Sequence, residues 1–185
     1  MISLRLIAAE TARVLTGVVL IVSGLLKAID PVGSALKIGE YLAPILDERW
    51  AWSGMISLTL SFVLCAGEFL LGAFLLMGIY RKLSARLSVA FFAGMTFVSL
   101  YSLFADPVSD CGCFGDAIHL THFETLLKNI VLLPLSYLVL RDARSLRHLF
   151  SRRERWLVAV LAVVGIVVFM VQNYRHLPLV DFRPY

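Results

Sequence analysis

Five long apolar stretches constrain this chain more than any other feature. They lie at residues 7–29, 53–79, 87–105, 123–140 and 156–174, and the last contains no charged side chain. Each is close to the roughly 20 residues that an α-helix needs to cross a bilayer. A helical segment satisfies its own backbone hydrogen bonds, which the interior of a bilayer requires. We therefore expect an all-α bundle of five transmembrane helices that lies in the lipid bilayer.

Composition supports a membrane protein and argues against a nucleic-acid partner. The chain has 185 residues, 59% of them hydrophobic, and a mean hydropathy of +0.85, which exceeds what a soluble domain of this size needs for one core. The net charge is +4, but most of the basic residues lie in two short connections, at 81–86 and 141–155. This pattern is typical of a protein that is oriented in a membrane, so we predict no nucleic-acid binding.

The charges in the connections also predict the topology. The two basic connections are expected in the cytoplasm by the positive-inside bias. The loop at residues 106–124 contains four acidic residues and no Lys or Arg, so we place it outside together with the first connection. Five crossings then leave the amino terminus in the cytoplasm and the carboxyl terminus outside.

The chain divides into a four-helix part and a C-terminal extension. Residues 1–140 are predicted to form a four-helix membrane domain with an external cysteine loop at 106–122. Within this domain, apolar residues in segment 31–52 recur at near-helical spacing, which indicates a short helix in the membrane interface, anchored by Trp50 and Trp52. Residues 141–185 supply the basic loop, the fifth helix and a short external tail.

The chemistry of the external loop centres on two cysteines. Cys111 and Cys113 are separated only by Gly112, so a disulfide between them closes a small, strained ring. Strain makes a disulfide easier to reduce, which favours thiol–disulfide exchange over a structural role. Gly112 and Gly115 permit backbone conformations that a β-carbon opposes. We therefore predict Cys111 and Cys113 as the catalytic pair of a candidate thiol–disulfide oxidoreductase.

Other residues of the loop modify this prediction. The carboxylates of Asp110 and Asp116 disfavour a neighbouring thiolate and slow its attack, while Phe114 supplies an apolar side chain next to the pair. The pair is therefore expected to be attacked by a thiolate of a partner protein, or to be activated by groups elsewhere in the chain.

Two alternatives for the loop stay open. The first is a static disulfide or a pair of buried free thiols. The second is a zinc or copper site with four soft or borderline ligands, Cys111, Cys113, His119 and His122, although one-residue cysteine spacing is unusual for zinc. We rank the metal site below exchange chemistry.

Charged residues inside the predicted helices suggest a pairing. Glu68 and Arg13 lie at similar predicted depths from the cytoplasmic side and are expected to pair across two helices. Alternatively, Arg13 pairs with Glu10 at the i, i+3 spacing, and Glu68 is then protonated or lines a polar cavity. The pairing is either a structural clamp or part of a proton relay. Cys65, roughly 18 Å below the outer surface by helix rise, is expected to be a buried free thiol.

Three motifs resemble one family of membrane proteins. They are Ser23-Gly-Leu-Leu-Lys27 followed by Asp30-Pro31, Glu68-Phe-Leu-Leu-Gly72, and Cys111-Gly-Cys-Phe-Gly115. Over about residues 10–140 the chain resembles the DoxX-like proteins, specifically the methylamine-utilisation MauE branch. The resemblance implies a four-helix bundle in the bacterial inner membrane, working with periplasmic thioredoxin-like proteins to form or maintain disulfides.

The resulting hypothesis is an exchange protein that passes electrons between a periplasmic partner and the membrane. The partner is a thioredoxin-like protein or a secreted, cysteine-containing client, and a membrane quinone is the candidate carrier. Trp50, Trp52, Tyr101 and Phe104 are candidates to surround a quinone head group, although interfacial aromatic belts also occur without any ligand. The rival hypothesis is a non-catalytic assembly or maturation factor for a secreted redox enzyme, with a purely structural loop disulfide.

Overall fold

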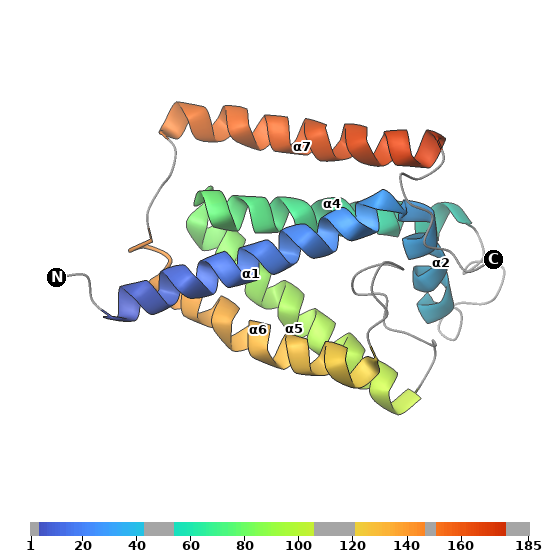
Figure 1. The fold of residues 1–185 in the computed structure, drawn as a ribbon, viewed down its shortest axis with the longest axis horizontal. Helices are drawn as coiled ribbons and strands as arrows, with labels where there is room; N and C mark the ends of the chain where they lie inside the picture. The colour runs from blue at the N-terminus through green and yellow to red at the C-terminus, as the bar shows by residue number, and fades with distance from the viewer. Residues whose placement is uncertain (1–3, 43–53, 106–120, 147–150, 177–185) are drawn as a thin grey trace.

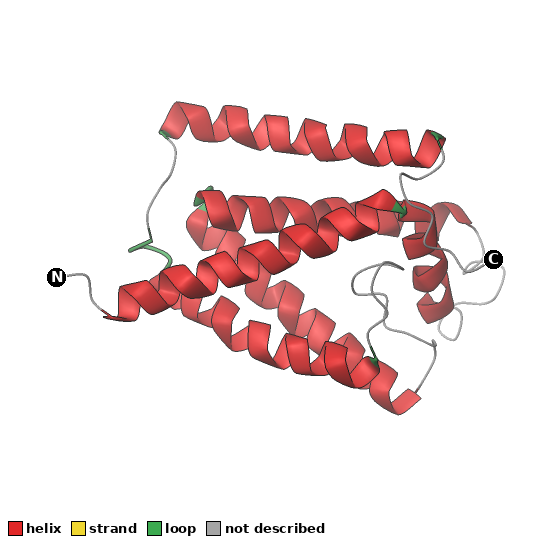
Figure 2. Cartoon of the chain, viewed as in Figure 1, coloured by secondary structure: helices red, strands yellow, loops and turns green. Residues whose placement is uncertain are grey.

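A computed structural model describes residues 4–42, 54–105, 121–146 and 151–176 of the chain. Within these ranges all regular structure is helical and no strand is present (Figure 2). The helices are α1 (Leu4–Ile29), α2 (Pro31–Leu42), α4 (Gly54–Met77), α5 (Arg81–Ala105), α6 (His122–Asp142) and α7 (Arg152–Arg175). All except α2 are long and apolar enough to cross a membrane. The predicted all-α fold with five spans is confirmed.

The helices form two packed pairs and one peripheral helix. α1 packs along α4, α5 packs along α6, and α1 joins the two pairs through α6 (Figure 1). α7 lies on the outside of α4, and α2 lies across one end of the bundle. This end, the α2 end, contains Ile29, Gly54, Ala105, His122 and Arg175; the opposite, basic end contains Leu4, Met77, Arg81, Asp142 and Arg152.

The two ends differ in the connections that they hold. Residues 81–86, predicted as a connection, form the first turns of α5 at the basic end, and the basic segment 141–155 also begins there. The helix ends that flank segment 106–120 lie at the α2 end. The described helix ends on either side of segment 106–120 are therefore separated from the basic end by the length of the bundle. The assignment of the basic end to the cytoplasm stays a prediction from the charge pattern.

Glycines set the close contact between α1 and α4. A β-carbon on Gly24 of α1 would lie 2.5 Å from the backbone nitrogen of Phe69, and one on Gly72 of α4 would lie 2.7 Å from the carbonyl oxygen of Gly17. Backbones that approach this closely leave no space for a side chain, which is the usual reason for small residues between membrane helices. These contacts fix the register of α1 against α4.

Local sequence signals fix several helix ends. Thr121 and Glu124 form a reciprocal capping box at the start of α6, and Ser151 and Glu154 form one at the start of α7. In each, the hydroxyl accepts from the backbone of the third helical residue and the Glu side chain accepts from the capping residue. At the end of α4, Gly78 has a φ of 68°, and Ile79 N donates to Phe74 O at 2.9 Å, as in a Schellman motif.

Burial differs strongly among the spans. In the most apolar window of α7 only 17% of the residues are buried, against 50% for α1, so α7 is the least buried of the five spans. Ser88, Ser99 and Ser102 of α5 are buried, whereas Tyr101 is exposed. α2 confirms a helix within 31–52, but the predicted anchors Trp50 and Trp52 lie outside the described residues.

Candidate functional site

The predicted cysteine site lies in a part of the chain that the structure does not describe. Segment 106–120 contains Asp110, Cys111, Gly112, Cys113, Phe114, Gly115, Asp116 and His119. The geometry of this loop is therefore not tested, and its role stays a prediction. The described helices instead bring together a second set of polar residues near the same end of the bundle.

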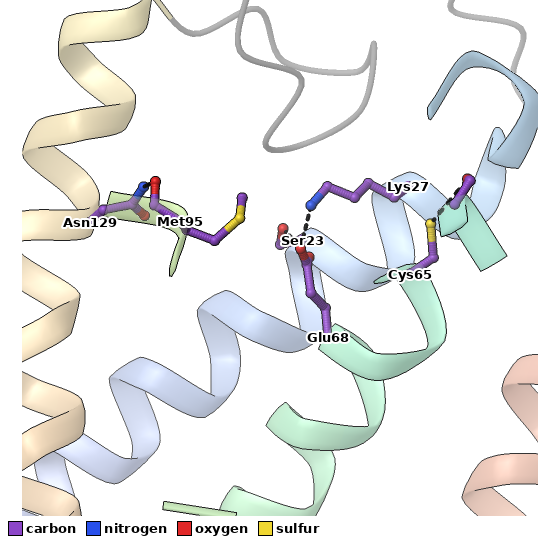
Figure 3. Close-up of polar contacts among 7 residues, drawn as sticks. Ser23, Lys27, Cys65, Glu68, Met95 and Asn129 are labelled. Carbon is purple, nitrogen blue, oxygen red and sulfur yellow. Dashed lines mark hydrogen bonds and ion pairs between the residues drawn. The ribbon is translucent and has the colours of Figure 1, made fainter. Parts of the chain in front are cut away.

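A buried ion pair between α1 and α4 is the centre of this set. Lys27 Nζ donates to Glu68 Oε1, and Ser23 Oγ donates to Glu68 Oε2 at 2.6 Å. The side chain of Glu68 is 1% exposed and that of Lys27 is 9% exposed. Figure 3 shows Lys27 and Ser23 pointing toward Glu68. Both carboxylate oxygens thus have a donor, and a charge that would be costly in a membrane has an opposite charge beside it.

The arrangement follows from helix geometry. Ser23 and Lys27 are four residues apart, so they lie on one face of α1. Gly24 lies between them and packs against Phe69, the residue after Glu68. The glycine contact therefore places Glu68 opposite the face of α1 that carries Ser23 and Lys27.

The predicted pair between Arg13 and Glu68 is wrong, and the alternative partner for Arg13 is confirmed. Arg13 Nη2 lies 2.7 Å from Glu10 Oε2. Arg13 precedes Lys27 by about 21 Å along α1 at the usual rise per residue. The prediction assumed that the start of α1 and the end of α4 lie at equal depth on the cytoplasmic side. Instead, Gly17 of α1 lies beside Leu76, almost at the end of α4, so Arg13 is level with the end of that helix.

Cys65 is a buried free thiol, as predicted, but its surroundings are more polar than expected. It precedes Glu68 by one turn of α4, and its sulfur lies 3.8 Å from Ser61 Oγ. Ser61 Oγ also donates to the carbonyl oxygen of Pro31, at 2.8 Å, and so connects α4 to the start of α2. Buried polar groups thus run along α4 from Ser61 to Glu68.

A small cavity separates the ion pair from the α5–α6 pair. Its volume is about 10 Å³. It is lined on the polar side by Ser23, Lys27, Glu68, Lys128 and Asn129, and on the apolar side by Val19, Leu20, Phe91, Phe92 and Met95.

Asn129 is held in place on the far side of this cavity. Its Nδ2 donates to Ser99 Oγ at 2.9 Å and to the carbonyl oxygen of Met95 at 3.3 Å, which also connects α6 to α5 (Figure 3). Asn129 is 1% exposed. Its position toward Glu68 is therefore fixed by α5 rather than by the ion pair.

The metal and quinone predictions receive no support from the described residues. These residues contain no group of three His, Cys, Asp or Glu side chains placed to hold a metal ion. His122 is the buried first residue of α6, while the other three proposed ligands, Cys111, Cys113 and His119, lie in the segment not described. Of the quinone candidates, Tyr101 is 43% exposed and Phe104 is 82% exposed.

An apolar cavity of about 660 Å³ lies between α2, α4 and α7 at the α2 end. It is lined by Val32, Ala35, Leu36, Gly39, Glu40, Gly54, Met55, Ser57, Leu58 and Tyr174. Tyr101 and Phe104 are not among these lining residues, and the other two predicted aromatic residues, Trp50 and Trp52, lie outside the described part of the chain.

Comparison with known families identifies the relationship. The family model described as methylamine utilisation protein MauE matches residues 5–142. The chain belongs to the MauE family. The matched region contains α1 to α6, and therefore the buried ion pair and the cysteine loop, whereas α7 follows it. No curated protein and no solved structure shows a significant similarity to the chain.

Sequence reasoning quoted the motifs that contain Ser23, Lys27 and Glu68 but missed Ser23 and Lys27 as the partners of Glu68, and it missed Asn129 entirely. A signal was present, because Ser23 and Lys27 recur at helical spacing on the same face as Gly24. Lys27 was read as a residue near the end of a span. It is buried because the chain turns at Asp30, whose Oδ1 accepts from Gly33 N at 2.9 Å, and α2 then crosses the end of the bundle.

Proposed function

We propose that this MauE-family membrane protein exchanges thiols and disulfides with a partner protein through Cys111 and Cys113. The observation that carries the proposal is the Cys-Gly-Cys sequence in the connection between two membrane helices, α5 and α6. A one-residue spacing gives a strained ring that a thiolate opens readily. The connection is acidic, which favours a location outside the cytoplasm, where disulfides persist.

The exchange proceeds in two balanced steps. A thiolate of the partner attacks one sulfur of the Cys111–Cys113 disulfide, and the other loop sulfur leaves as a thiolate and takes up a proton. A second thiolate of the partner then attacks the partner's sulfur in the mixed disulfide and releases the second loop thiol. The partner loses two electrons and gains a disulfide, and the loop becomes a dithiol; the reverse sequence reduces a partner. Reoxidation of the loop needs a two-electron acceptor, for which we propose a membrane quinone that takes up two protons.

Hydrogen bonds connect the two helices that flank this loop to each other and to α2. Asn129 joins α6 to Ser99 of α5 near the α2 end, and Ser102 Oγ donates to Tyr41 Oη of α2 at 3.1 Å. Thr121 and Glu124 cap the first turn of α6, directly after the loop. The two helices that flank the cysteine segment, α5 and α6, are thus joined to each other and to α2.

Trapping of the mixed disulfide tests the proposal. In intact cells, a membrane-impermeant thiol reagent is expected to label Cys111 and Cys113 only after mild reduction, while buried Cys65 stays unlabelled. One of the single variants Cys111→Ser and Cys113→Ser is expected to accumulate a mixed disulfide with its partner, because the resolving thiol is missing. Cys65→Ala is the matched control and is expected to accumulate none.

The double variant distinguishes exchange from assembly. If Cys111→Ser, Cys113→Ser supports full disulfide formation in the client protein at normal protein levels, the exchange proposal is wrong. A non-catalytic assembly or maturation role then takes its place.

A further inference from the structure

One face of α2 borders the apolar cavity at the α2 end. Val32, Ala35, Leu36 and Gly39 lie on one side of this helix, because residues three or four apart share a face. Together they form the α2 wall of the cavity, whose volume is about 660 Å³. Leu36 is exposed. In the described part of the chain, this apolar face of α2 is thus only partly covered by other helices.

The size and the position of the cavity suit a membrane-soluble ligand. Pockets for small ligands measure about 300–1,000 Å³ and are lined mainly by apolar groups. Met55 of α4 and Tyr174 of α7 line the cavity and are exposed, so it opens at the surface of the described helices. A β-carbon added to Gly54 would meet no atom within 4 Å, so the α4 wall is not packed against protein there. The cavity is therefore accessible to molecules dissolved in the bilayer.

Two polar side chains of the lining have no partner among the described residues. No described cation pairs with the Glu40 carboxylate, and no described group hydrogen-bonds to the Tyr174 hydroxyl. The Tyr174 ring packs edge to face against Phe62 of α4, with the ring centroids 5.9 Å apart, which holds the hydroxyl in place. The apolar cavity thus contains a carboxylate that accepts hydrogen bonds and a phenol that donates one.

The charge of the lining distinguishes between classes of lipid-soluble molecules. Glu40 is the only charged residue among the described lining residues, and no Lys or Arg is present there. A phosphate head group binds best to Lys and Arg and is repelled by a carboxylate, so this lining disfavours a phospholipid head group. A neutral head group with carbonyl or hydroxyl oxygens fits the same side chains.

We infer that this cavity binds a membrane quinone, with the head group at Glu40 and Tyr174 and the start of the apolar tail along Leu36 and Met55. A quinone carbonyl accepts from the Tyr174 hydroxyl, and a quinol hydroxyl donates to the Glu40 carboxylate, so each redox form has a partner. The inference rests on the proposed function, which needs a two-electron acceptor. In that reaction two thiols lose two electrons and two protons as the S–S bond forms, and the quinone gains them in two new O–H bonds.

The cavity lies at the same end of the bundle as the helix ends that flank the cysteine segment. Ser102 of α5 donates to Tyr41 Oη of α2 at 3.1 Å, four residues before segment 106–120 begins. Tyr41 directly follows Glu40 of the cavity lining. Helix α2 therefore contacts both the end of α5 and the quinone cavity.

Photo-crosslinking of the full chain in phosphatidylcholine nanodiscs tests the site. The probe is a decyl-substituted benzoquinone with a photoreactive azide on the ring, and the readout is the mass of the labelled peptides. We expect labelling in α2, the first turn of α4 or the last turn of α7, and competition by the same quinone without the azide. Replacement of half of the lipid by phosphatidylglycerol is expected to leave the labelling unchanged.

Two glycine variants test whether the cavity holds the quinone. Gly54→Leu places a side chain in open space at the α4 wall and is expected to lose most of the labelling, because the side chain occupies the cavity. Gly94→Leu makes the same change in α5, where an added β-carbon likewise meets no atom within 4 Å and no residue lines the cavity. It is expected to label like the wild type.

A second pair of variants tests the head-group contact without changing the volume of the cavity. Tyr174→Phe keeps the ring and removes the hydroxyl, so the quinone is expected to bind about fivefold more weakly, as loss of one hydrogen bond predicts. Tyr137→Phe removes the hydroxyl of an exposed tyrosine of α6 that is not among the lining residues. It is expected to leave the affinity unchanged.

Three results would overturn the quinone site. They are suppression of the labelling by phosphatidylglycerol as strong as that by free quinone, labelling outside the cavity, and unchanged labelling in both Gly54→Leu and Tyr174→Phe. The variant Cys111→Ser, Cys113→Ser keeps Glu40 and Tyr174 and is expected to bind quinone like the wild type. If it also supports full disulfide formation, the exchange proposal fails while the site stands. A wild type that exchanges disulfides but is not labelled overturns the site alone.

Discussion

Helix α4 has two neighbours that are held to it in opposite ways. Against α1 it presents Gly72, the buried Glu68 and a backbone contact to Gly24. Against α7 it presents mainly apolar side chains, such as Phe62, whose ring meets that of Tyr174 edge to face at 5.9 Å. α7 has the highest hydropathy of the five spans but the lowest buried share, 17% against 50% for α1.

This difference shows what holds helices together in a membrane. Apolar side chains gain little by leaving lipid for protein, because lipid tails are equally apolar. Close backbone contact at glycines and buried polar pairs distinguish one neighbour from another. The α1–α4 contact contains both. In the described part of α7, Asn173 donates to Ala28 O of α1, and Gly165 has no atom within 4 Å of an added β-carbon. Three substitutions test this interpretation.

The largest expected effect is at the ion pair. Glu68→Ala leaves Lys27 buried without its counter-charge, so we expect the free energy of unfolding to fall by about 3–5 kcal/mol, measured by denaturant titration in mixed micelles. The double variant Lys27→Met, Glu68→Leu removes both charges and is expected to recover most of the loss. A Glu68→Ala protein as stable as the wild type would contradict the importance of this contact.

A smaller effect is expected at the glycine contact. In Gly24→Ala the new β-carbon would lie 2.5 Å from Phe69 N, so α1 and α4 must move apart, at a cost of about 1–3 kcal/mol in the same titration. Gly165→Ala is the matched control in α7. It is expected to be neutral or to stabilise the protein by up to about 1 kcal/mol, since alanine favours helix. Equal losses in both variants would show that the two contacts do not differ as described.

The smallest effect is expected at the polar contact of α7. Asn173→Ala removes the hydrogen bonds to Ala28 O and Phe169 O, and a hydrogen bond between membrane helices is worth about 0.6 kcal/mol on average. Thermal unfolding in nanodiscs should therefore show only a slight decrease in stability. A loss as large as that of Glu68→Ala would mean that α7 is held as firmly as α1.

The helices were predictable because hydropathy and length depend on local sequence alone. Each predicted span coincides with one long helix, although α5 begins at Arg81, six residues before its predicted span. The capping pairs Thr121–Glu124 and Ser151–Glu154 could have fixed two of the starts. The pair between Arg13 and Glu10 could also be predicted from the sequence, because side chains three residues apart are neighbours in any helix.

The partner of Glu68 was not predictable in the same way. A depth counted from the helix ends assumes that the ends of neighbouring helices on one side of the membrane lie at the same level. The actual register depends on where Gly24 meets Phe69 and Gly17 meets Leu76, which is a property of the packed pair. Asn129 was missed for the same reason, because its relation to Glu68 needs α6 to be placed opposite α4.

At the basic end α1 and α6 are joined by a salt bridge and by apolar packing. Arg5 of α1 pairs with Asp142 of α6 at 2.7 Å, and Ala9, Ala12, Val139 and Ala143 pack beside this pair. From this end the two helices diverge toward the α2 end (Figure 1). Helix α6 is about 30 Å long, so a relative rotation of a few degrees between α1 and α6 at the basic end would displace their ends at the α2 end by a few ångströms. The ion pair and the ends of α5 and α6 that flank segment 106–120 lie toward the α2 end, where small rotations at the basic end produce the larger displacements.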